Sequence, residues 1–369
     1  MSPPRSKRHL DESDIRSRPN PRGTRPRTKD RPKHDDAVAG WVVTVDRGRY
    51  TCLVDEGEPG ERVVTAMSAR ELGRAKILTG DRVGLVGDTS GAPGSLARAV
   101  RVEPRTTMLR RSADDVDPVE RGLVANAKVL AVVTALADPE PRARMIDRCL
   151  VAAYDAGMTP LLVLTKADLA DPAPFVAQYA ALDVPYVVTR STGGAVPARA
   201  QGDLTPFEAG RAQLSGLDDV RERLTGTTTV LIGHSGVGKS TLVNALVPGA
   251  GRATGIVNDV TGRGRHTSTS AYALRLPQGG WVIDTPGVRS FGLAHVQPDR
   301  IVTAFPDLAP GLDDCPRGCT HDEPECGLDA FCAHGGAGPS GLARLESLRR
   351  LLRSRAGTTD DDRPEAAPS

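Results

Sequence analysis

The chain has 369 residues, of which 39% are hydrophobic and 25% are charged, and its formal net charge is +2. This length allows two or three domains, and a net charge so near zero gives no whole-chain argument for nucleic-acid binding. No run approaches the roughly 18 apolar residues of a membrane-spanning helix. No apolar segment of a secretion signal follows the charged N-terminus, so we expect a cytoplasmic protein that does not enter a membrane.

Residues 1–36 form a basic segment with eleven Lys and Arg residues against six Asp and Glu residues, repeated Pro and few apolar residues. Such a composition cannot bury enough apolar surface to offset the entropy lost on ordering, so a disordered tail is expected. This tail either keeps the chain soluble or tethers it electrostatically to RNA or another polyanion.

Residues 37–105 contain short apolar runs separated by Gly, Asp and Pro, a pattern typical of strands joined by turns. The expected strands are Trp41–Val45, Tyr50–Val54, Arg62–Ala66, Arg82–Val86 and Ala97–Val102. Five strands in so short a segment predict a small β-barrel of the oligonucleotide-binding (OB) type.

Residues 106–297 show strands alternating with helices, which indicates a parallel sheet covered by helices, an α/β domain. The expected strands are Val129–Ala135, Leu161–Thr165, Tyr186–Thr189, Val230–Gly233 and Trp281–Asp284. Helices are expected near Ala143–Ala156 and up to Leu224. Residues 193–213, rich in Gly, Pro and Ala, are predicted to be an inserted loop.

Residues 298–356 are predicted to form an α-helical domain that ends with a helix near Gly341–Ser354. Residues 357–369 are acidic and contain Pro, so a second disordered tail is expected. The predicted fold class is therefore multidomain: a barrel, an α/β domain and a helical domain between two tails.

Residues 233–240 match the phosphate-loop pattern G-x-x-x-x-G-K-[ST]. The loop follows an apolar strand and precedes the helical run Thr241–Leu246, which is the context this motif requires. Its glycines allow backbone amides to close around phosphate oxygens, Lys239 should reach the β- and γ-phosphates, and the Ser240 hydroxyl should bind Mg²⁺. The alternative to a phosphate-binding loop is a Gly-rich turn before a helix. The expected nucleotide contacts are Gly233, His234, Ser235, Gly236, Val237, Gly238, Lys239, Ser240 and Thr241.

The sequence Asp284-Thr285-Pro286-Gly287 follows a second apolar strand. A carboxylate at the end of a neighbouring strand suits a further magnesium contact, commonly through water, and the Gly287 amide can approach the γ-phosphate. Asp-x-x-Gly is common by itself, but here it stands about 45 residues after a phosphate loop, which makes the interpretation persuasive.

The sequence Thr165-Lys166-Ala167-Asp168 ends another strand and resembles the guanine-reading Asn-Lys-x-Asp motif of GTPases. The Asp168 carboxylate can accept hydrogen bonds from guanine N1–H and the 2-amino group, a donor pair that adenine lacks. The alternative is an exposed Lys/Asp pair at a strand end. Ordinary GTPases carry this motif last, whereas here it precedes the phosphate loop, so the order of the motifs is circularly permuted.

Four of the six cysteines lie close together in the last part of the chain. Cys315, Cys319, His321 and Cys326 offer three thiolates and one imidazole, which suit a closed tetrahedral Zn²⁺ site. Reduced structural cysteines without metal are the alternative, and Cys332 or His334 could replace one ligand.

Taken together, these motifs resemble the ribosome small-subunit-dependent GTPase A family of circularly permuted bacterial GTPases. The likeness covers roughly residues 38–352 and includes the phosphate loop, the Cys/His cluster and four further segments: 80–83, 103–106, 264–267 and 283–289. Three features depart from the family pattern. Thr165 replaces the usual Asn, the zinc spacings are each one residue shorter than C-x4-C-x-H-x5-C, and residues 193–213 are inserted.

The resemblance implies a GTP hydrolase that binds GTP and GDP with Mg²⁺, holds one Zn²⁺ per chain, and associates with the small ribosomal subunit and its RNA late in subunit maturation. We expect it to be a monomer. Many GTPases place a glutamine after Asp-x-x-Gly to orient the attacking water, but Val288 stands there, so intrinsic turnover should be slow. His266 is the candidate catalytic residue, although it could be merely an exposed polar residue, and Thr267, or alternatively Thr269, is a candidate magnesium ligand.

Two other functions remain compatible with these residues. One is a GTP-dependent RNA-binding switch that acts on another RNA or protein with negligible turnover. The other is an ATP-using enzyme with a phosphate loop, which Asp168 disfavours.

Overall fold

The structure of the chain is a computed structural model that describes residues 34–73, 75–112, 120–192, 214–248, 271–285, 292–293, 295–323 and 325–356. Residues Asp36–Ser369 belong to one compact unit. Most of the two predicted tails, the predicted insertion at 193–213 and the segment around His266 lie outside the described residues. No helix in the described part of the chain is long and apolar enough to cross a membrane.

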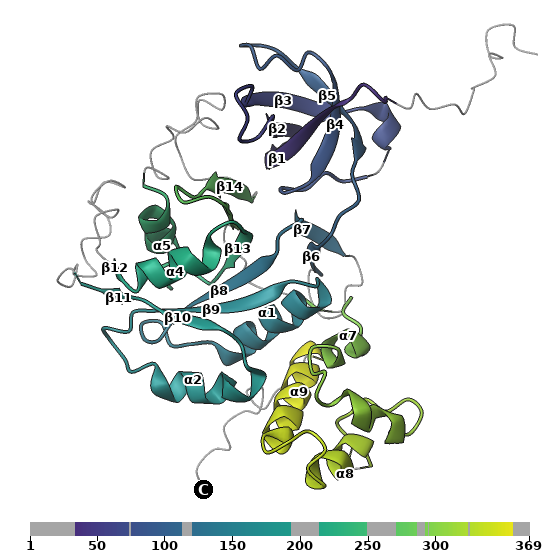
Figure 1. The fold of residues 1–369 in the computed structure, drawn as a ribbon, viewed down its shortest axis with the longest axis vertical. Coiled ribbons are helices and arrows are strands. Elements are labelled where there is room, and N and C mark those ends of the chain that lie inside the picture. The colour runs from purple at the N-terminus through teal and green to yellow at the C-terminus, as the bar shows by residue number, and fades with distance from the viewer. Residues whose placement is uncertain are drawn as a thin grey trace, which may run out of the picture. The chain divides into compact units, whose positions relative to one another are not determined.

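Five strands close into a barrel in the N-terminal part of the described chain (Figure 1). They are β1 (Val38–Asp46), β2 (Arg49–Val54), β3 (Arg62–Ser68), β4 (Arg82–Gly87) and β5 (Ala97–Val102). The ring runs β1–β2–β3–β5–β4 and closes where β4 pairs with β1, so these strands have no free edge. The predicted barrel is confirmed, and four of its strands extend beyond the expected bounds.

Strand β1 is apolar on both faces because it faces two cores. Val42 lies in the barrel core with Cys52 and Leu85. Trp41 and Val43 point the other way, since side chains alternate along a strand, and they join the large core of the sheet domain. The run of buried residues in this strand therefore marks the place where the barrel meets the next domain.

Two barrel segments that carry the family resemblance are joined by a buried ion pair. Arg105 donates from Nε and Nη2 to the two carboxylate oxygens of Asp81, at 2.7 and 2.8 Å. Asp81 is fully buried, so this bidentate pairing supplies the partners that a buried charge needs. Beside it, Gly80 has a φ of 91°, and a Cβ there would lie 2.0 Å from the Ala125 carbonyl oxygen. Only glycine fits this position.

The sheet that follows is built mainly from parallel strands. In spatial order they are β10 (Tyr186–Val188), β9 (Thr159–Thr165), β8 (Val129–Ala135), β13 (Thr228–Ile232) and β15 (Trp281–Asp284), with β14 (Tyr272–Arg275) antiparallel to β15. Every residue of β8 is buried, as expected for a strand covered on both faces. The alternating strands and helices predicted for this region are confirmed.

Helices cover both faces of this sheet (Figure 1). They are α1 (Ala143–Asp155), α2 (Ala173–Tyr179), α4 (Leu217–Leu224) and α5 (Lys239–Leu246). On one face, Val220 of α4 and Leu242 of α5 share a core with Val133 of β8. On the opposite face, Leu130 and Val132 of the same strand pack with α1.

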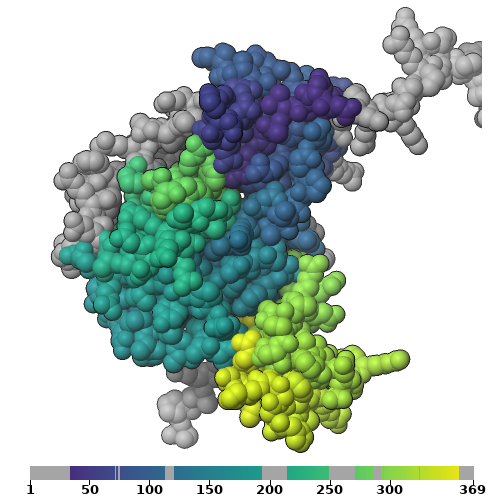
Figure 2. Space-filling model, viewed as in Figure 1, coloured from purple at the N-terminus to yellow at the C-terminus, as the bar shows by residue number. Residues whose placement is uncertain are grey.

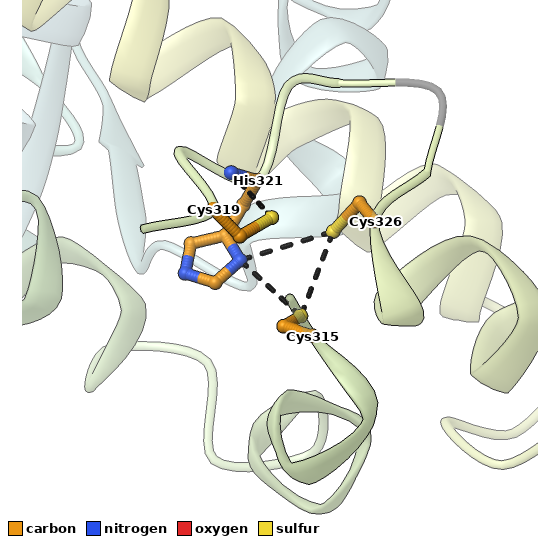
Figure 3. Close-up of side chains that lie close together, drawn as sticks. All are labelled: Cys315, Cys319, His321 and Cys326. Atoms are coloured by element: carbon orange, nitrogen blue, oxygen red, sulfur yellow. Dashed lines mark hydrogen bonds between the residues drawn. The ribbon is translucent and has the colours of Figure 1, made fainter. Parts of the chain in front are cut away.

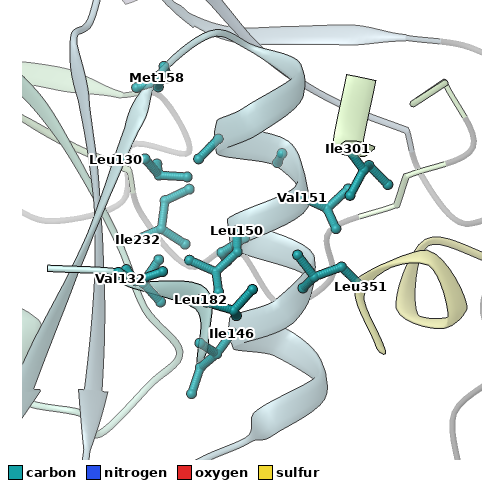
Figure 4. Packing of buried hydrophobic residues seen from close by; sticks show 14 of the residues in the cluster. Leu130, Val132, Ile146, Leu150, Val151, Met158, Leu182, Ile232, Ile301 and Leu351 are labelled. Carbon is teal, nitrogen blue, oxygen red and sulfur yellow. The ribbon is translucent and has the colours of Figure 1, made fainter. Parts of the chain in front are cut away.

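Helix α1 lies between the sheet and the C-terminal helices (Figure 4). Leu150 faces Val132 and Ile232 of the sheet, while Val151 lies beside Ile301 and Leu351. All of residues 146–153 are buried, including Asp147 and Arg148. A helix buried on nearly every side ties the last part of the chain to the sheet domain.

The C-terminal segment is helical, as predicted. It contains α7 (Pro298–Val302), the 3-10 helix η5 (Ala309–Asp314), α8 (Gly327–Ala333) and α9 (Gly341–Ala356). The yellow-green C-terminal helices touch the teal sheet domain in Figure 2. There Arg350 of α9 lies 3.2 Å from the Asp147 carboxylate and stacks over the Tyr179 ring at 4.8 Å.

Several short elements were not predicted. They are helix α2 (Ala173–Tyr179), the 3-10 helices η2 (Arg70–Leu72) and η3 (Ala180–Leu182), the hairpin of β6 (Met108–Arg111) and β7 (Arg121–Ala125), and the pair β11 (Arg190–Ser191) and β12 (Leu214–Ser215). Strand β14 was also missed. Each is short and lacks a long apolar period, so its pairing partners rather than its own sequence define it.

Candidate functional site

The phosphate loop connects the end of β13 to the first residue of α5. Gly236 and Gly238 have φ values of 85° and 87°, in the left-handed region that favours glycine. A Cβ on Gly233 would lie 2.5 Å from the Val133 carbonyl oxygen, so this residue must also lack a side chain. The loop is therefore closely packed against β8 and keeps its backbone amides at the N-terminus of α5, where they favour an anion.

The Lys239 side chain brings two predicted motifs together. Its Nζ donates to Asp284 Oδ1 at 2.5 Å and to the Thr285 carbonyl oxygen at 2.6 Å. Both side chains of this ion pair are nearly buried, 11% and 12% exposed. The Thr285 hydroxyl donates to the Leu231 carbonyl oxygen at 2.8 Å and fixes the end of β15 beside β13. Lys239 therefore joins the phosphate loop to the end of β15.

Thr165 links the guanine motif to the phosphate loop. Its hydroxyl lies 2.6 Å from the Val237 carbonyl oxygen and 3.2 Å from that of Thr134, and it has one proton to donate. The shorter contact joins the two motifs. A threonine at this position, where the family pattern has Asn, thus provides a direct tie between the loops, and the residue is buried.

The rest of the guanine motif lies against two neighbouring loops. Lys166 has a φ of 57° and donates from Nζ to the Asp138 carbonyl oxygen in the loop after β8. The exposed Asp168 carboxylate accepts from the Ser191 amide at 2.9 Å, and the Ala167 amide donates to the Thr189 carbonyl oxygen at 3.2 Å. The segment after β10 therefore forms one wall beside Asp168.

The sheet explains how a permuted order of motifs still forms one site. Strands β9, β13 and β15 are parallel members of one sheet, and each predicted motif follows the carboxyl end of its strand. The carboxyl ends of parallel strands meet at one edge, so connectivity does not matter to the position of the motifs. Gly287, His266 and Thr267 lie outside the described residues.

The predicted metal ligands converge in the C-terminal helical segment (Figure 3). The ligand atoms of Cys315, Cys319, His321 and Cys326 all lie within 4.8 Å of one another. Cys315 Sγ is 3.8 Å from Cys326 Sγ and 3.6 Å from His321 Nδ1. In a tetrahedral site with Zn–S bonds of about 2.3 Å, two sulfurs lie about 3.8 Å apart. The distance between the Cys315 and Cys326 sulfurs therefore fits a bound Zn²⁺.

A second layer of side chains holds the metal-site loop. Arg349 of α9 donates to the His321 carbonyl oxygen at 2.9 Å and pairs with both carboxylate oxygens of Asp329. Glu323 accepts from the Thr320 amide at 3.0 Å and from the Thr320 hydroxyl at 2.9 Å. Such outer contacts orient the ligands of metal sites, and sequence reasoning did not find them.

Cys332 and His334 lie apart from this cluster. The four-residue group contains neither of them, and His334 Nδ1 lies 2.7 Å from the Ala330 carbonyl oxygen within its own helical turn. The group that could hold a cation therefore consists of the four residues that the spacing indicated first.

Comparison with known proteins places this arrangement in a family. The model of the RsgA GTPase family matches residues 102–294, more than half of the chain. The chain belongs to the RsgA GTPase family. The matched segment contains the guanine motif, the phosphate loop and Asp284, and it ends before the Cys/His cluster.

Relatives with sequence similarity support this membership. The small ribosomal subunit biogenesis GTPase RsgA of Ectopseudomonas mendocina (strain ymp) is 39% identical over 258 residues, which cover 68% of each protein. The protein of the same name from Gemmatimonas aurantiaca is 33% identical over 324 residues, which cover 87% of this chain and 99% of the relative. The likeness to the second relative therefore extends beyond residues 102–294 on both sides.

Two solved structures share the fold. YjeQ from Thermotoga maritima is 24% identical with a TM-score of 0.55, and it covers 87% of this chain and 99% of its own. YloQ, described as a circularly permuted GTPase, is 20% identical with a TM-score of 0.57, and the match covers 91% and 100% of the two chains. The permuted architecture expected for the RsgA GTPase family is thus confirmed for this chain.

One residue of the site gave no signal in the sequence. Tyr272 of β14 donates from its hydroxyl to Asp284 Oδ2 at 3.0 Å. It stands twelve residues before Asp284 and belongs to no motif, so only the pairing of β14 with β15 brings the two together.

We expect about one zinc per chain in protein prepared without chelator, bound by Cys315, Cys319, His321 and Cys326. Cys319→Ala should release the metal and loosen the C-terminal helices, because the free energy of metal binding also stabilises the folded loop that carries the ligands. Elemental analysis measures the zinc content, and thermal unfolding measures the stability of the helices. GTP binding should be retained.

The matched control is Cys332→Ala, a buried cysteine outside the cluster, which should keep its zinc. Protein with no zinc, or loss of zinc in the control variant alone, would contradict this ligand set.

Proposed function

We propose that this chain is a cytoplasmic GTP hydrolase that binds the small ribosomal subunit, assists its late maturation, and hydrolyses GTP faster when bound to the subunit. The observation that carries the proposal is the meeting of the guanine motif, the phosphate loop and Asp284 at one sheet edge in permuted order. Relatives that bear the name small ribosomal subunit biogenesis GTPase supply the partner. The barrel at 37–105, the GTPase domain at 106–297 and the metal-binding domain at 298–356 are the proposed working parts.

The phosphates of GTP would take the place of Asp284 and Thr285 as acceptors for Lys239 Nζ. The backbone amides of residues 233–240 would donate to the same phosphates, and Ser240 with Asp284 would hold Mg²⁺, with Thr267 as a third candidate. The ion held by Ser240 and Asp284 would supply positive charge that offsets the negative charge of the phosphates. Asp168 would release the Ser191 amide, or share it, to accept from guanine.

Specificity for guanine follows from Asp168 and the loops beside it. The carboxylate is exposed at the sheet edge, so a base can reach it without a rearrangement of the core. Thr165 keeps the motif in register with the phosphate loop through Val237. The loop that would bind the base and the loop that would bind the triphosphate are thus connected by this hydrogen bond before the nucleotide binds.

Cosedimentation with purified small subunits tests the partner. The chain should pellet with small subunits in a non-hydrolysable GTP analogue, as a monomer, and much less with large subunits or in GDP. Equal pelleting with both subunits, in the GTP analogue and in GDP alike, would contradict the proposal. It would indicate non-specific electrostatic binding of RNA by the basic segment at residues 1–36.

His266 is proposed to orient the attacking water, because Val288 cannot accept its proton. His266→Ala should retain GTP binding and subunit association but lose most of the subunit-stimulated turnover, by about a hundredfold. Single-turnover hydrolysis with and without small subunits measures this, with His334→Ala as the control. Unchanged stimulation in His266→Ala would remove this residue from the mechanism.

A further inference from the structure

Both carboxylate oxygens of Asp284 have a partner. Oδ1 accepts from Lys239 Nζ at 2.5 Å, and Oδ2 accepts from the Tyr272 hydroxyl at 3.0 Å. Tyr272 is the direct partner of Asp284 in the register of β14 and β15. Cross-strand partners on one face lie close enough for such a contact, so the phenol is placed by the sheet itself.

The Tyr272 phenol keeps its proton at neutral pH. A tyrosine hydroxyl has an ordinary pKa of about 10, so it is protonated at pH 7. The hydroxyl therefore remains a donor to the carboxylate. Hydrogen bonds with an ionised acceptor are stronger than those between neutral groups.

The two partners of Asp284 have different fates when GTP enters. Lys239 belongs to the phosphate loop, and its Nζ is the group expected to turn to the phosphates. Tyr272 stands on the side of β15 away from β13. Among the described residues, its hydroxyl is therefore the partner of Asp284 that would stay in place once Lys239 has turned.

The strand that carries Tyr272 is also held from the barrel side. Thr44 of β1 pairs with Tyr272 in register. The carbonyl oxygen of the preceding residue, Ala271, accepts from the Thr79 hydroxyl at 3.0 Å and from the Thr44 hydroxyl at 3.4 Å. The backbone at Tyr272 is therefore fixed by two elements, β15 and the barrel.

We propose that Tyr272 is a positioning residue for Asp284: its hydroxyl holds Oδ2 so that Oδ1 presents itself to the magnesium ion of the bound nucleotide. This inference rests on the proposed function, since it assigns a support to one of the groups that would hold Mg²⁺. It predicts a loss of magnesium affinity rather than of nucleotide affinity when the hydroxyl is removed.

Tyr272→Phe deletes the hydroxyl and keeps the ring. Binding of a non-hydrolysable GTP analogue is titrated with Mg²⁺, and the same affinity is measured in EDTA. We expect the magnesium concentration for half-maximal enhancement to rise about tenfold, while the affinity in EDTA and the melting temperature remain close to those of the wild type. A merely structural role would shift the EDTA affinity or the melting temperature instead.

The matched control is Tyr50→Phe, which removes a strand tyrosine hydroxyl bonded to the Ser68 hydroxyl at 2.9 Å within the barrel. It should leave the magnesium dependence unchanged. In an Asp284→Asn background, Tyr272→Phe should add little, because the carboxylate that it positions is gone. Equal magnesium dependence of Tyr272→Phe and Tyr50→Phe would overturn the proposal, whereas wild-type protein that ignores GTP or Mg²⁺ altogether would overturn the proposed function itself.

Discussion

Lys239→Ala should lower the affinity for GTP at least about a hundredfold, or roughly 3 kcal/mol. The substitution removes the cation of the phosphate loop. Lys239 lies in the phosphate loop and pairs with Asp284. Its replacement by Ala also leaves the nearly buried Asp284 carboxylate without an ion-pair partner. The empty site then carries more negative charge, which repels a triphosphate.

Equilibrium binding of labelled GTP measures the effect, and Lys128→Ala is the matched control. Lys128 is exposed and stands just before β8, at the opposite end of the parallel strands. The Lys128→Ala variant should bind GTP like the wild type. If Lys239→Ala bound GTP with the wild-type affinity, residues 233–240 would not be the phosphate site.

Asp168→Asn should reduce GTP affinity about a hundredfold and raise the affinity for xanthosine triphosphate. The carboxylate would accept from N1–H and from the 2-amino group of guanine, whereas an amide would accept from N1–H and donate to the 2-carbonyl of xanthine. Two hydrogen bonds to a charged group, each worth about 1.5–3 kcal/mol, set the scale of the change.

Competition binding with GTP, xanthosine triphosphate and ATP measures this exchange of preference. Asp171→Asn is the control, because Asp171 accepts from the Ala173 amide at the start of α2 and an amide oxygen can do the same. ATP that competes as well as GTP with the wild type would exclude the guanine assignment.

The sequence was sufficient for features whose signal is local. Strands such as Ala97–Val102 and Trp281–Asp284 agree with their predicted bounds because their apolar residues and flanking turns mark both ends. The convergence of Cys315, Cys319, His321 and Cys326 was predicted for the same reason, since a short run of Cys and His residues is what a metal site requires.

Two kinds of feature were not predictable from the sequence: the exact ends of some helices and strands, and contacts between distant segments. The helix after the phosphate loop begins at Lys239 rather than Thr241, because Gly238 supplies the turn. The strand before it ends at Ile232, which leaves Gly233 in the loop. Only tertiary structure shows that the Thr165 hydroxyl contacts Val237 or that Tyr272 contacts Asp284, since no periodicity or motif connects residues on separate strands.

Single-turnover hydrolysis of GTP, with and without purified small ribosomal subunits, tests the central claim most directly. The proposed function predicts slow turnover by the chain alone, a rise of at least about tenfold with small subunits, and no comparable rise with large subunits or with ATP as the nucleotide. A GTP turnover rate that small subunits leave unchanged would contradict it.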